Sequence, residues 1–297
     1  MAVKSLKLIV LSVILLVPFL KTESQNTPKY RVAVCDWMIL KRQKLGEFAL
    51  ARQINADGVE MDMGPLGNRV LFDNRFRNAV DANVFKHTAD SLGVEVPSIA
   101  MSGFFAQNFI IRENYVDLLK DCFNTMKIFN SKIAFLPLGG CGNDWKKEGA
   151  MHDSLVGRLH VAGEMALNRG FVVAIRTAMD AKYDIKLLKQ INSKGVKIYY
   201  NFQDAADSQR DICKELKRLG RENIAQIHAS NTDSVILKYD NEINLPKIKR
   251  TLDRMGWSGW LVVERSRDVK RVKDVKYNFG SNVEYLKEVF WKGNKLK

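Results

Sequence analysis

The stretch "FVVAIRTAMDAKYDIKLLKQINSKGVKIYYNFQD", residues 171–204, contains two apolar runs rich in β-branched residues with an amphipathic helical pattern between them. The two runs, 171–177 and 196–204, both end in polar residues. Strand patterns that alternate with helical patterns of this length indicate β–α–β units, in which neighbouring strands run parallel. This stretch therefore predicts a parallel sheet covered by helices.

The same alternation extends along the chain and gives eight strand–helix units, which repeat about every 30 residues. The predicted strands lie within residues 30–38, 58–63, 94–102, 132–140, 171–177, 196–204, 224–231 and 259–266. Left-handed glycine caps are expected where helices end, at Gly93, Gly170, Gly195, Gly220 and Gly256. Eight units in one chain predict a single-domain (β/α)₈ TIM barrel. A doubly wound open sheet is the alternative, but no glycine-rich fingerprint follows the first strand.

The N-terminal residues are expected to lie outside the barrel. Lys4 and Lys7 precede a short apolar run, Leu8 to Leu20, which ends at Lys21. This pattern predicts a signal peptide at 1–24 and a barrel domain at 28–297. The chain is then exported to the periplasm or secreted, with no stable membrane span after cleavage; an uncleaved anchor is the competing interpretation.

Composition limits the classes of partner. The formal net charge is +14, which invites a nucleic-acid interpretation, but Lys and Arg are spread along helical faces and do not form one patch. We therefore expect no nucleic-acid partner and a small-molecule substrate. The four Cys are scattered without CxxC spacing, which indicates a core that does not depend on disulfides.

Polar residues end most of the predicted strands. In a parallel barrel these ends meet at one rim, where the active sites of TIM barrels lie. They include Asp36, Trp37, Glu60, Asp62, Ser98, Ser102, Gly139, Gly140, Arg176, Asn201, Asp204, His228 and Glu264. His228 is the only one of the four His at a strand end, and a neutral imidazole can serve as a metal ligand or a proton carrier.

At this point the chain resembles the xylose isomerase-like barrels, which comprise sugar and sugar phosphate isomerases and epimerases, with the family 2 apurinic endonucleases as distant relatives. The resemblance rests on His228 in "QIHASN", Glu264 in "LVVERS", the turn within "MGWSGWLVVE" and Glu60 in "GVEMDM". It covers essentially the whole mature chain and implies the same barrel fold.

The resemblance also implies a divalent metal (Mn, Mg, Zn or Co) held by Glu, Asp, His and Glu from strands five to eight. His228 and Glu264 match two of these ligand positions. Arg176 and Asn201 stand where the first Glu and the Asp are expected. A guanidinium close to a dication is repulsive, so the metal is expected to be lost, or moved to His228 and Glu264 with Asp204 or Glu60.

These residues suggest proton abstraction next to a carbonyl, on a free sugar, a keto-glycoside or a sugar acid. Glu264 and Glu60 are the candidate bases, and His228 and Arg176 the candidate electrophiles. The candidate substrate-binding residues are Trp37, Asn201, Asp204 and Arg267. Two alternatives remain open: a β-eliminating lyase or hydratase acting on oxidised glycosides, and a carbohydrate-binding barrel without catalysis.

Overall fold

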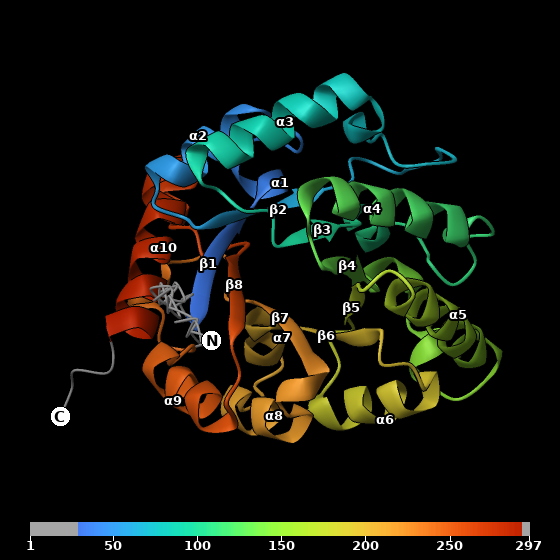
Figure 1. Ribbon diagram of the computed structural model, residues 1–297. Coiled ribbons are helices and arrows are strands. Elements are labelled where there is room, and N and C mark those ends of the chain that lie inside the picture. Colours follow the sequence, from blue (N-terminus) through green and yellow to red (C-terminus); the bar gives the residue numbers. More distant parts are fainter. Residues whose placement is uncertain (1–28, 293–297) are drawn as a thin grey trace, which may run out of the picture.

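The computed structural model describes residues 29–292, and within this range eight parallel strands close into a barrel in chain order (Figure 1). They are β1 (Tyr30–Cys35), β2 (Gly58–Asp62), β3 (Ser98–Ala100), β4 (Ile133–Pro137), β5 (Val172–Arg176), β6 (Val196–Asn201), β7 (Ile224–His228) and β8 (Gly259–Val263). The predicted (β/α)₈ barrel is confirmed. The signal-peptide prediction, residues 1–24, lies outside the described residues.

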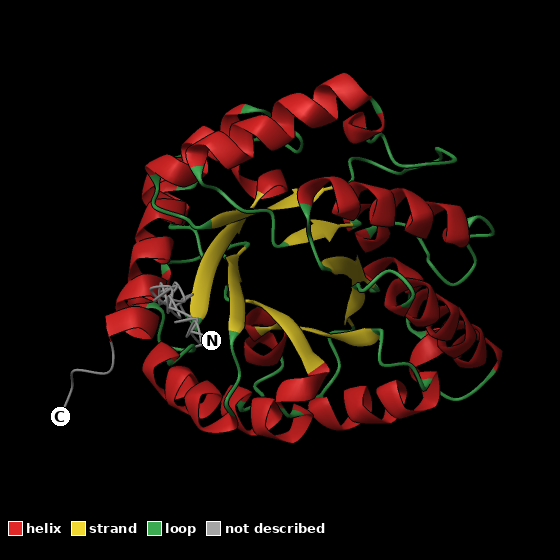
Figure 2. Ribbon diagram, in the orientation of Figure 1, coloured by secondary structure: helices red, strands yellow, loops and turns green. Residues whose placement is uncertain are grey.

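Helices surround the barrel in an outer ring (Figure 2). They are α2 (Gly46–Gln53), α3 (Ala79–Leu92), α4 (Tyr115–Phe129), α5 (Ala150–Leu167), α6 (Ala181–Ile191), α8 (Ile212–Leu219), α9 (Leu245–Met255) and α10 (Val275–Lys292). Short helices α1 (Asp36–Ile39) and α7 (Phe202–Asp207) directly follow β1 and β6. Single 3₁₀ turns lie at Arg75–Arg77, Ser102–Phe105, Gly139–Cys141, Asp144–Lys146, Arg221–Asn223, Leu237–Tyr239 and Val269–Arg271. Among the described residues, none of the helices is long and apolar enough to cross a membrane.

The ring closes where the first strand meets the last. Each residue of β1 from Tyr30 to Val34 pairs with β8 along one edge, and the other edge of β1 pairs with β2. The indole N–H of Trp291, in α10, donates to the carbonyl oxygen of Tyr30 at 2.8 Å. The Tyr30 hydroxyl in turn donates to Asp253, in α9, at 2.7 Å. The C-terminal helices therefore hold the first strand in place.

Strand alternation sets what lies inside the barrel, because successive side chains point to opposite faces. One apolar group fills the interior and consists of Ala33, Cys35, Ala100, Phe135, Ala174, Tyr199 and Val262. The larger apolar cluster lies between the strands and the helices. Residues two apart on a strand face the same side. Arg176, Asn201 and Glu264 each follow one of these interior residues by two positions, so a polar layer lies directly above the apolar one.

The prediction of left-handed glycine caps is confirmed at two of the five positions, since Gly220 ends α8 with ψ of 155° and Asn168, two residues before Gly170, ends α5. Gly93 and Gly256 are left-handed caps with φ of 63° and 67°, and Gly170 and Gly220 also have positive φ. Gly195 was predicted as a cap and is not one, since Asn192 ends α6 in the left-handed region with φ of 51°. Gly195 instead packs against α5, where an added Cβ would collide with the carbonyl oxygen of Gly163.

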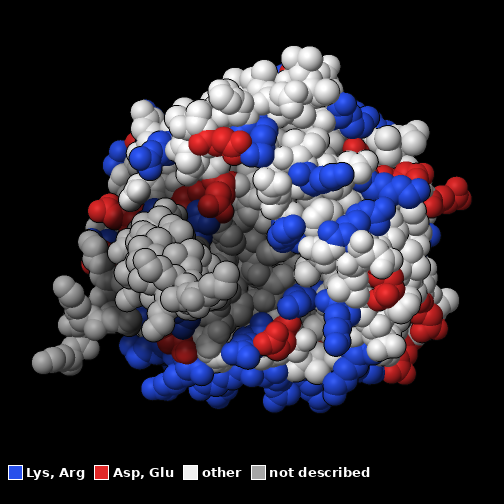
Figure 3. Space-filling model, in the orientation of Figure 1, with Lys and Arg blue, Asp and Glu red and all other residues white. Residues whose placement is uncertain are grey.

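The charge distribution and the cysteines agree with the sequence-based expectations. Figure 3 shows Lys and Arg side chains at several places on one face, including the lower edge over α6, α8 and α9. Cys35, Cys122, Cys141 and Cys213 are all buried and free.

A methyl group at position 195 has no space between β6 and α5. We predict that Gly195→Ala destabilises the protein by about 1–3 kcal/mol, because a backbone carbonyl must move. Gly157→Ala is the matched control, since Gly157 lies on exposed helix α5 with nothing within 4 Å of its added Cβ. This control should stabilise the protein by about 0.5–1 kcal/mol. Urea unfolding measures both, and equal effects of the two variants would contradict the close-packing argument.

Candidate active site

Three side chains converge on one carboxylate oxygen at the carboxyl ends of β5 to β8. Oε2 of Glu264 lies 3.2 Å from Nη1 of Arg176 and 3.5 Å from Nδ2 of Asn201. It also lies 3.6 Å from Nδ1 of His228. The backbone N–H of Glu264 donates to the Ser230 hydroxyl at 2.7 Å, which fixes the start of the loop after β8. Among the described residues, no hydrogen bond reaches Oε1 of Glu264, so this oxygen remains available.

Arg176 is held by two carboxylates. Its Nε and Nη2 donate to the two oxygens of Asp204 at 2.8 and 2.6 Å, a bidentate pair with the first turn of α7. Its guanidinium also lies over the ring of Phe105, at 5.6 Å from the centroid. Burial opposes the charge of Arg176, but its contacts with Asp204 and Glu264 outweigh burial and raise the pKa of the guanidinium. Arg176 is therefore a fixed cation.

Asn201 connects this cluster to α7. Its Oδ1 accepts the backbone N–H of Gln203 at 2.7 Å and caps the helix, while Nδ2 faces Glu264. An aspartate here would place a second negative charge beside Glu264, whereas the amide donates to it. The amide of Asn201 is thus a hydrogen-bond donor to the Glu264 carboxylate at the end of β8.

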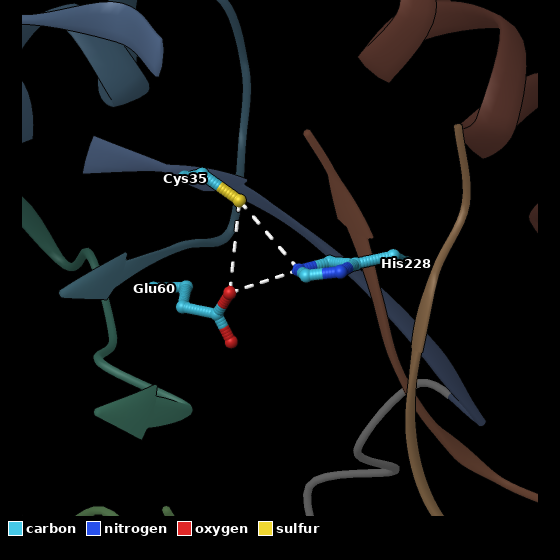
Figure 4. A group of neighbouring side chains, drawn as sticks. All are labelled: Cys35, Glu60 and His228. Carbon is cyan, nitrogen blue, oxygen red and sulfur yellow. Dashed lines mark hydrogen bonds and ion pairs between the residues drawn. The ribbon is translucent and has the colours of Figure 1, made fainter. Parts of the chain in front are cut away.

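A second group of side chains lies below this layer, where Glu60, Cys35 and His228 point toward one another from β2, β1 and β7 (Figure 4). Oε1 of Glu60 lies 2.9 Å from Nε2 of His228 and 3.6 Å from Sγ of Cys35. The sulfur and Nε2 are 3.7 Å apart. All three residues are 0% exposed. Burial, together with the charge of Glu60, raises the pKa of the Cys35 thiol well above its ordinary value.

The other oxygen of Glu60 is held from three further positions in the barrel. Oε2 accepts hydrogen bonds from the Ser98 hydroxyl, from the Tyr199 hydroxyl at 2.8 Å and from Nε2 of Gln226 at 3.2 Å. Both oxygens of Glu60 are therefore occupied by neighbouring side chains. Glu60 thus lies beneath His228 and orients the imidazole, and its role as a base on the substrate stays a prediction.

Trp37 and Arg267 have different surroundings. The Trp37 ring stacks on Phe135 at a centroid distance of 6.5 Å and meets His228 edge-on at 6.4 Å, so it lies beside the cluster and is partly exposed. Arg267 was predicted to bind substrate, but its Nε and Nη2 donate to Asp233, in the loop after β7. Arg267 thus joins two loops and does not belong to the cluster.

The usual metal site implied by the family resemblance does not fit these residues. Arg176 brings a guanidinium to the position of a carboxylate ligand, and Asn201 directs N–H groups at Glu264. A cation about 4 Å from a dication is repelled by several kcal/mol at an effective dielectric near 20. Both oxygens of Asp204 pair with Arg176, and its predicted roles as a relocated metal ligand and in substrate binding stay predictions.

A buried acidic group lies at the ends of β1 and β2. Oδ2 of Asp36 accepts the backbone N–H groups of Gln43 and Asp62, both at 3.0 Å. Arg42 lies 3.0 Å from Oδ1 of Asp62 and compensates part of its charge. Burial nevertheless raises the pKa of Asp62 to about 6 and the pKa of Asp36 well above its ordinary value. Glu47, from α2, lies against this group with neither carboxylate oxygen hydrogen-bonded.

The positions of the predicted strand ends indicated Asp36 and Asp62, but gave no sign of their neighbours Arg42 and Glu47. Arg42 and Glu47 come from a connecting segment and a helix, where periodicity gives no signal of an interior position. Gln226 was not predicted but had a usable signal, since it lies two residues before His228 and so faces the same side of the strand.

Residues 48–289 match the family described as the xylose isomerase-like TIM barrel. The chain belongs to this family. No curated protein matches it by sequence.

Several solved structures share the fold at low sequence identity. A xylose isomerase domain protein from Planctomyces limnophilus has a TM-score of 0.70 and 15% identity, covering 89% of this chain and 100% of that one. D-psicose 3-epimerase from Clostridium cellulolyticum H10, solved with D-tagatose, has a TM-score of 0.67 and 12% identity, with 88% and 99% covered. An AP endonuclease, family 2, from Brucella melitensis has a TM-score of 0.66 and 16% identity, with 87% and 99% covered.

The unpaired carboxyl of Glu47 should make stability depend on pH. Burial, and then the charge of Asp36, raises its pKa well above the ordinary value, so the folded chain retains a proton that the unfolded chain releases above about pH 4.3. Stability contributed by this group therefore falls as pH rises from about 5 to 8. We predict that Glu47→Gln stabilises the protein, with a gain that grows toward pH 8 by at most about 1.4 kcal/mol per pH unit.

Urea unfolding at pH 5, 6.5 and 8 measures this gain. Glu148→Gln is the control, because Glu148 is exposed and Lys186 lowers its pKa, which leaves it ionised throughout this range. A gain for Glu47→Gln that does not change with pH would contradict the prediction.

Proposed function

We propose that this protein is a sugar isomerase-like enzyme that abstracts a proton next to a carbonyl group. The observation that carries the proposal is the convergence of Arg176, Asn201 and His228 on Glu264 at the carboxyl ends of β5 to β8. This is the rim where TIM barrel enzymes act. Family membership supports a carbohydrate substrate, as do fold relatives that include L-ribulose 3-epimerase and 3-keto-D-glucoside 4-epimerase from E. coli.

Glu264 is the base in this proposal. Its Oε2 is fixed by hydrogen bonds from Arg176 and Asn201, which leaves Oε1 to remove the proton from carbon. Arg176 supplies the positive charge that the developing enediolate oxygen needs. A cation about 4 Å from that oxygen contributes about 4 kcal/mol at an effective dielectric near 20. This is about a thousandfold in rate, as an upper value, because Asp204 and Glu264 already compensate Arg176.

His228 has the proton-carrying role. Glu60 holds its Nε2, so the orientation of the ring is set from below, and Nδ1 faces Glu264. Because Nε2 donates to Glu60, Nδ1 keeps a lone pair that can take up the proton from Glu264 after the base has removed it from the substrate. His228 thus moves charge within the cluster, while Glu60 positions it.

The number of available carboxylates favours some outcomes over others. Inversion at carbon requires a proton donor on the opposite face of the substrate from the base. In the cluster of Arg176, Asp204 and Glu264, both oxygens of Asp204 are occupied, which leaves one free carboxylate oxygen. Return of the proton by the same base, as in isomerisation, or loss of a β-substituent therefore fits better than inversion.

Export, predicted from residues 1–24, bears on the substrate. A basic start followed by a short apolar run supports delivery to the periplasm or the exterior. We accordingly propose a free sugar, keto-glycoside or sugar acid over a phosphorylated metabolite. Trp37, beside His228, supplies an aromatic surface for a sugar ring.

The competing function, carbohydrate binding without catalysis, has one observation in its favour. Arg176 carries one positive charge between two carboxylates, so its guanidinium is already compensated without a ligand. Such a barrel would bind sugars and exchange no carbon-bound hydrogen.

Solvent exchange separates these functions. We predict that the protein incorporates deuterium from D₂O into a ketose or keto-glycoside, detected by NMR, and that Glu264→Gln lowers the exchange rate at least a hundredfold. Glu222→Gln is the matched control, because Glu222 is an exposed residue before β7, away from the cluster. Saturable sugar binding without exchange in the unaltered protein would refute the proposed reaction and favour the binding function.

Export has its own test. We predict that the full chain, produced in a bacterial host, is recovered from the periplasm or medium with a mass lowered by removal of about 24 residues. Lys4→Glu/Lys7→Glu, which removes the positive start, should leave unprocessed protein inside the cell. Recovery of the full-length chain from the cytoplasm in both cases would argue against a signal peptide.

A further inference from the structure

We propose that Cys35, Glu60 and His228 bind a zinc-class divalent ion inside the barrel, one layer below the polar cluster of Arg176, Asn201 and Glu264. Among residues 29–292, this is the group of three or more His, Cys, Asp and Glu side chains whose ligand atoms all lie within 4.8 Å of one another. The side chains come from three different strands and point at a common centre (Figure 4).

The distances between the three ligand atoms match those around a bound ion. Separations of 2.9, 3.6 and 3.7 Å place all three atoms on a circle with a radius of about 2.0 Å. Zinc bonds to nitrogen and oxygen at about 2.0–2.2 Å and to sulfur at about 2.3 Å. An ion slightly out of the plane of the three atoms therefore reaches all of them with only small side-chain movements.

The types of donor atom indicate which ion fits. A thiolate and an imidazole favour zinc or cobalt, whereas magnesium and calcium take oxygen ligands. The surrounding hydrogen bonds suit a metal ligand, since Oε2 of Glu60 is held by Ser98, Tyr199 and Gln226. Oε1 meets Nε2 of His228 and Sγ of Cys35, and an ion would take the place of the protons between these atoms, which binding releases. Carboxylate ligands that are oriented in this way are typical of metal sites.

An ion here would turn a buried nitrogen without a partner into an N–H that faces Glu264, and in this form His228 does not accept a proton from Glu264. Nδ1 of His228 is buried and has no hydrogen-bond partner. When Nε2 binds an ion, the ring proton moves to Nδ1, 3.6 Å from Oε2 of Glu264. The ion would thus orient a donor toward Glu264, while its full burial keeps it away from a substrate. The site does not depend on the reaction proposed above.

Burial determines how the ion is acquired. Cys35, Glu60 and His228 are 0% exposed, so the ion enters as the chain folds and exchanges slowly afterwards. The protein should therefore be produced in cells supplied with Zn²⁺ or with Co²⁺.

Metal analysis of the purified protein is the first measurement. We expect about one zinc or cobalt ion per chain, and the cobalt form should show the near-ultraviolet charge-transfer absorption of a thiolate ligand. X-ray absorption of the zinc form should show one sulfur in the first shell. Metal-free protein from both preparations, or metal without a sulfur ligand, would overturn the proposal.

Variants test the assignment of ligands. Cys35→Ser should abolish the charge-transfer absorption and lower the metal content at least tenfold. Cys122→Ser is the matched control, because Cys122 is equally buried but lies in α4. Absorption that survives in Cys35→Ser, or is lost in Cys122→Ser, would refute the assigned site. Should Cys35→Ser fail to fold, the sulfur signal in the X-ray absorption of the unaltered protein still decides.

Glu264→Gln separates this proposal from the proposed function. It removes the base but none of the three ligands, so metal content and charge-transfer absorption should be unchanged while deuterium exchange is lost. Loss of the metal in Glu264→Gln would place the ion at the upper cluster and refute the lower site.

Discussion

The carboxylate of Glu60 imposes the constraint on which the barrel interior depends. It is fully buried, and a buried charge without partners costs several kcal/mol. Hydrogen bonds offset this cost: Ser98, Tyr199 and Gln226 donate to one oxygen, and His228 lies within hydrogen-bond distance of the other. These partners come from β3, β6 and β7, so the carboxylate of β2 ties together strands that are not neighbours in the ring. The position of His228 follows from this arrangement.

Above that layer, the guanidinium of Arg176 places a positive charge close to where the family resemblance implies a divalent metal ion. Arg176 carries a single delocalised charge, and its planar N–H groups match Asp204 and Glu264 in fixed directions. Asn201 completes the change, because its amide donates where an aspartate would repel Glu264. Arg176 and Asn201, at the ends of β5 and β6, are therefore mutually compatible, and Arg176 gives the rim a fixed positive charge.

Much of this architecture could be predicted from the sequence, because periodicity reports which face of a strand or helix is buried. The repeat of strand and helix patterns gave the barrel, and the strand ends brought Arg176, Asn201, His228 and Glu264 to one rim. The role of Glu60 could not be predicted in this way, because its saturation depends on partners from distant strands. The surroundings of Arg267 could not be predicted for a similar reason: Asp233, in another loop, determines where its guanidinium lies. Gly195 showed that a glycine before a strand can serve close packing, while an asparagine ends the helix.

The closure of the ring has a consequence for how the protein is made. β1 needs β8 along one edge, and Trp291 and Asp253 hold Tyr30, so the first strand stays incompletely covered until nearly the whole chain has left the ribosome. Domains generally fold as units, and this one lacks its final partners throughout synthesis. Until those partners arrive, the unpaired edge of β1 is exposed, and such an edge must be shielded by chaperones if it is not to pair with another chain.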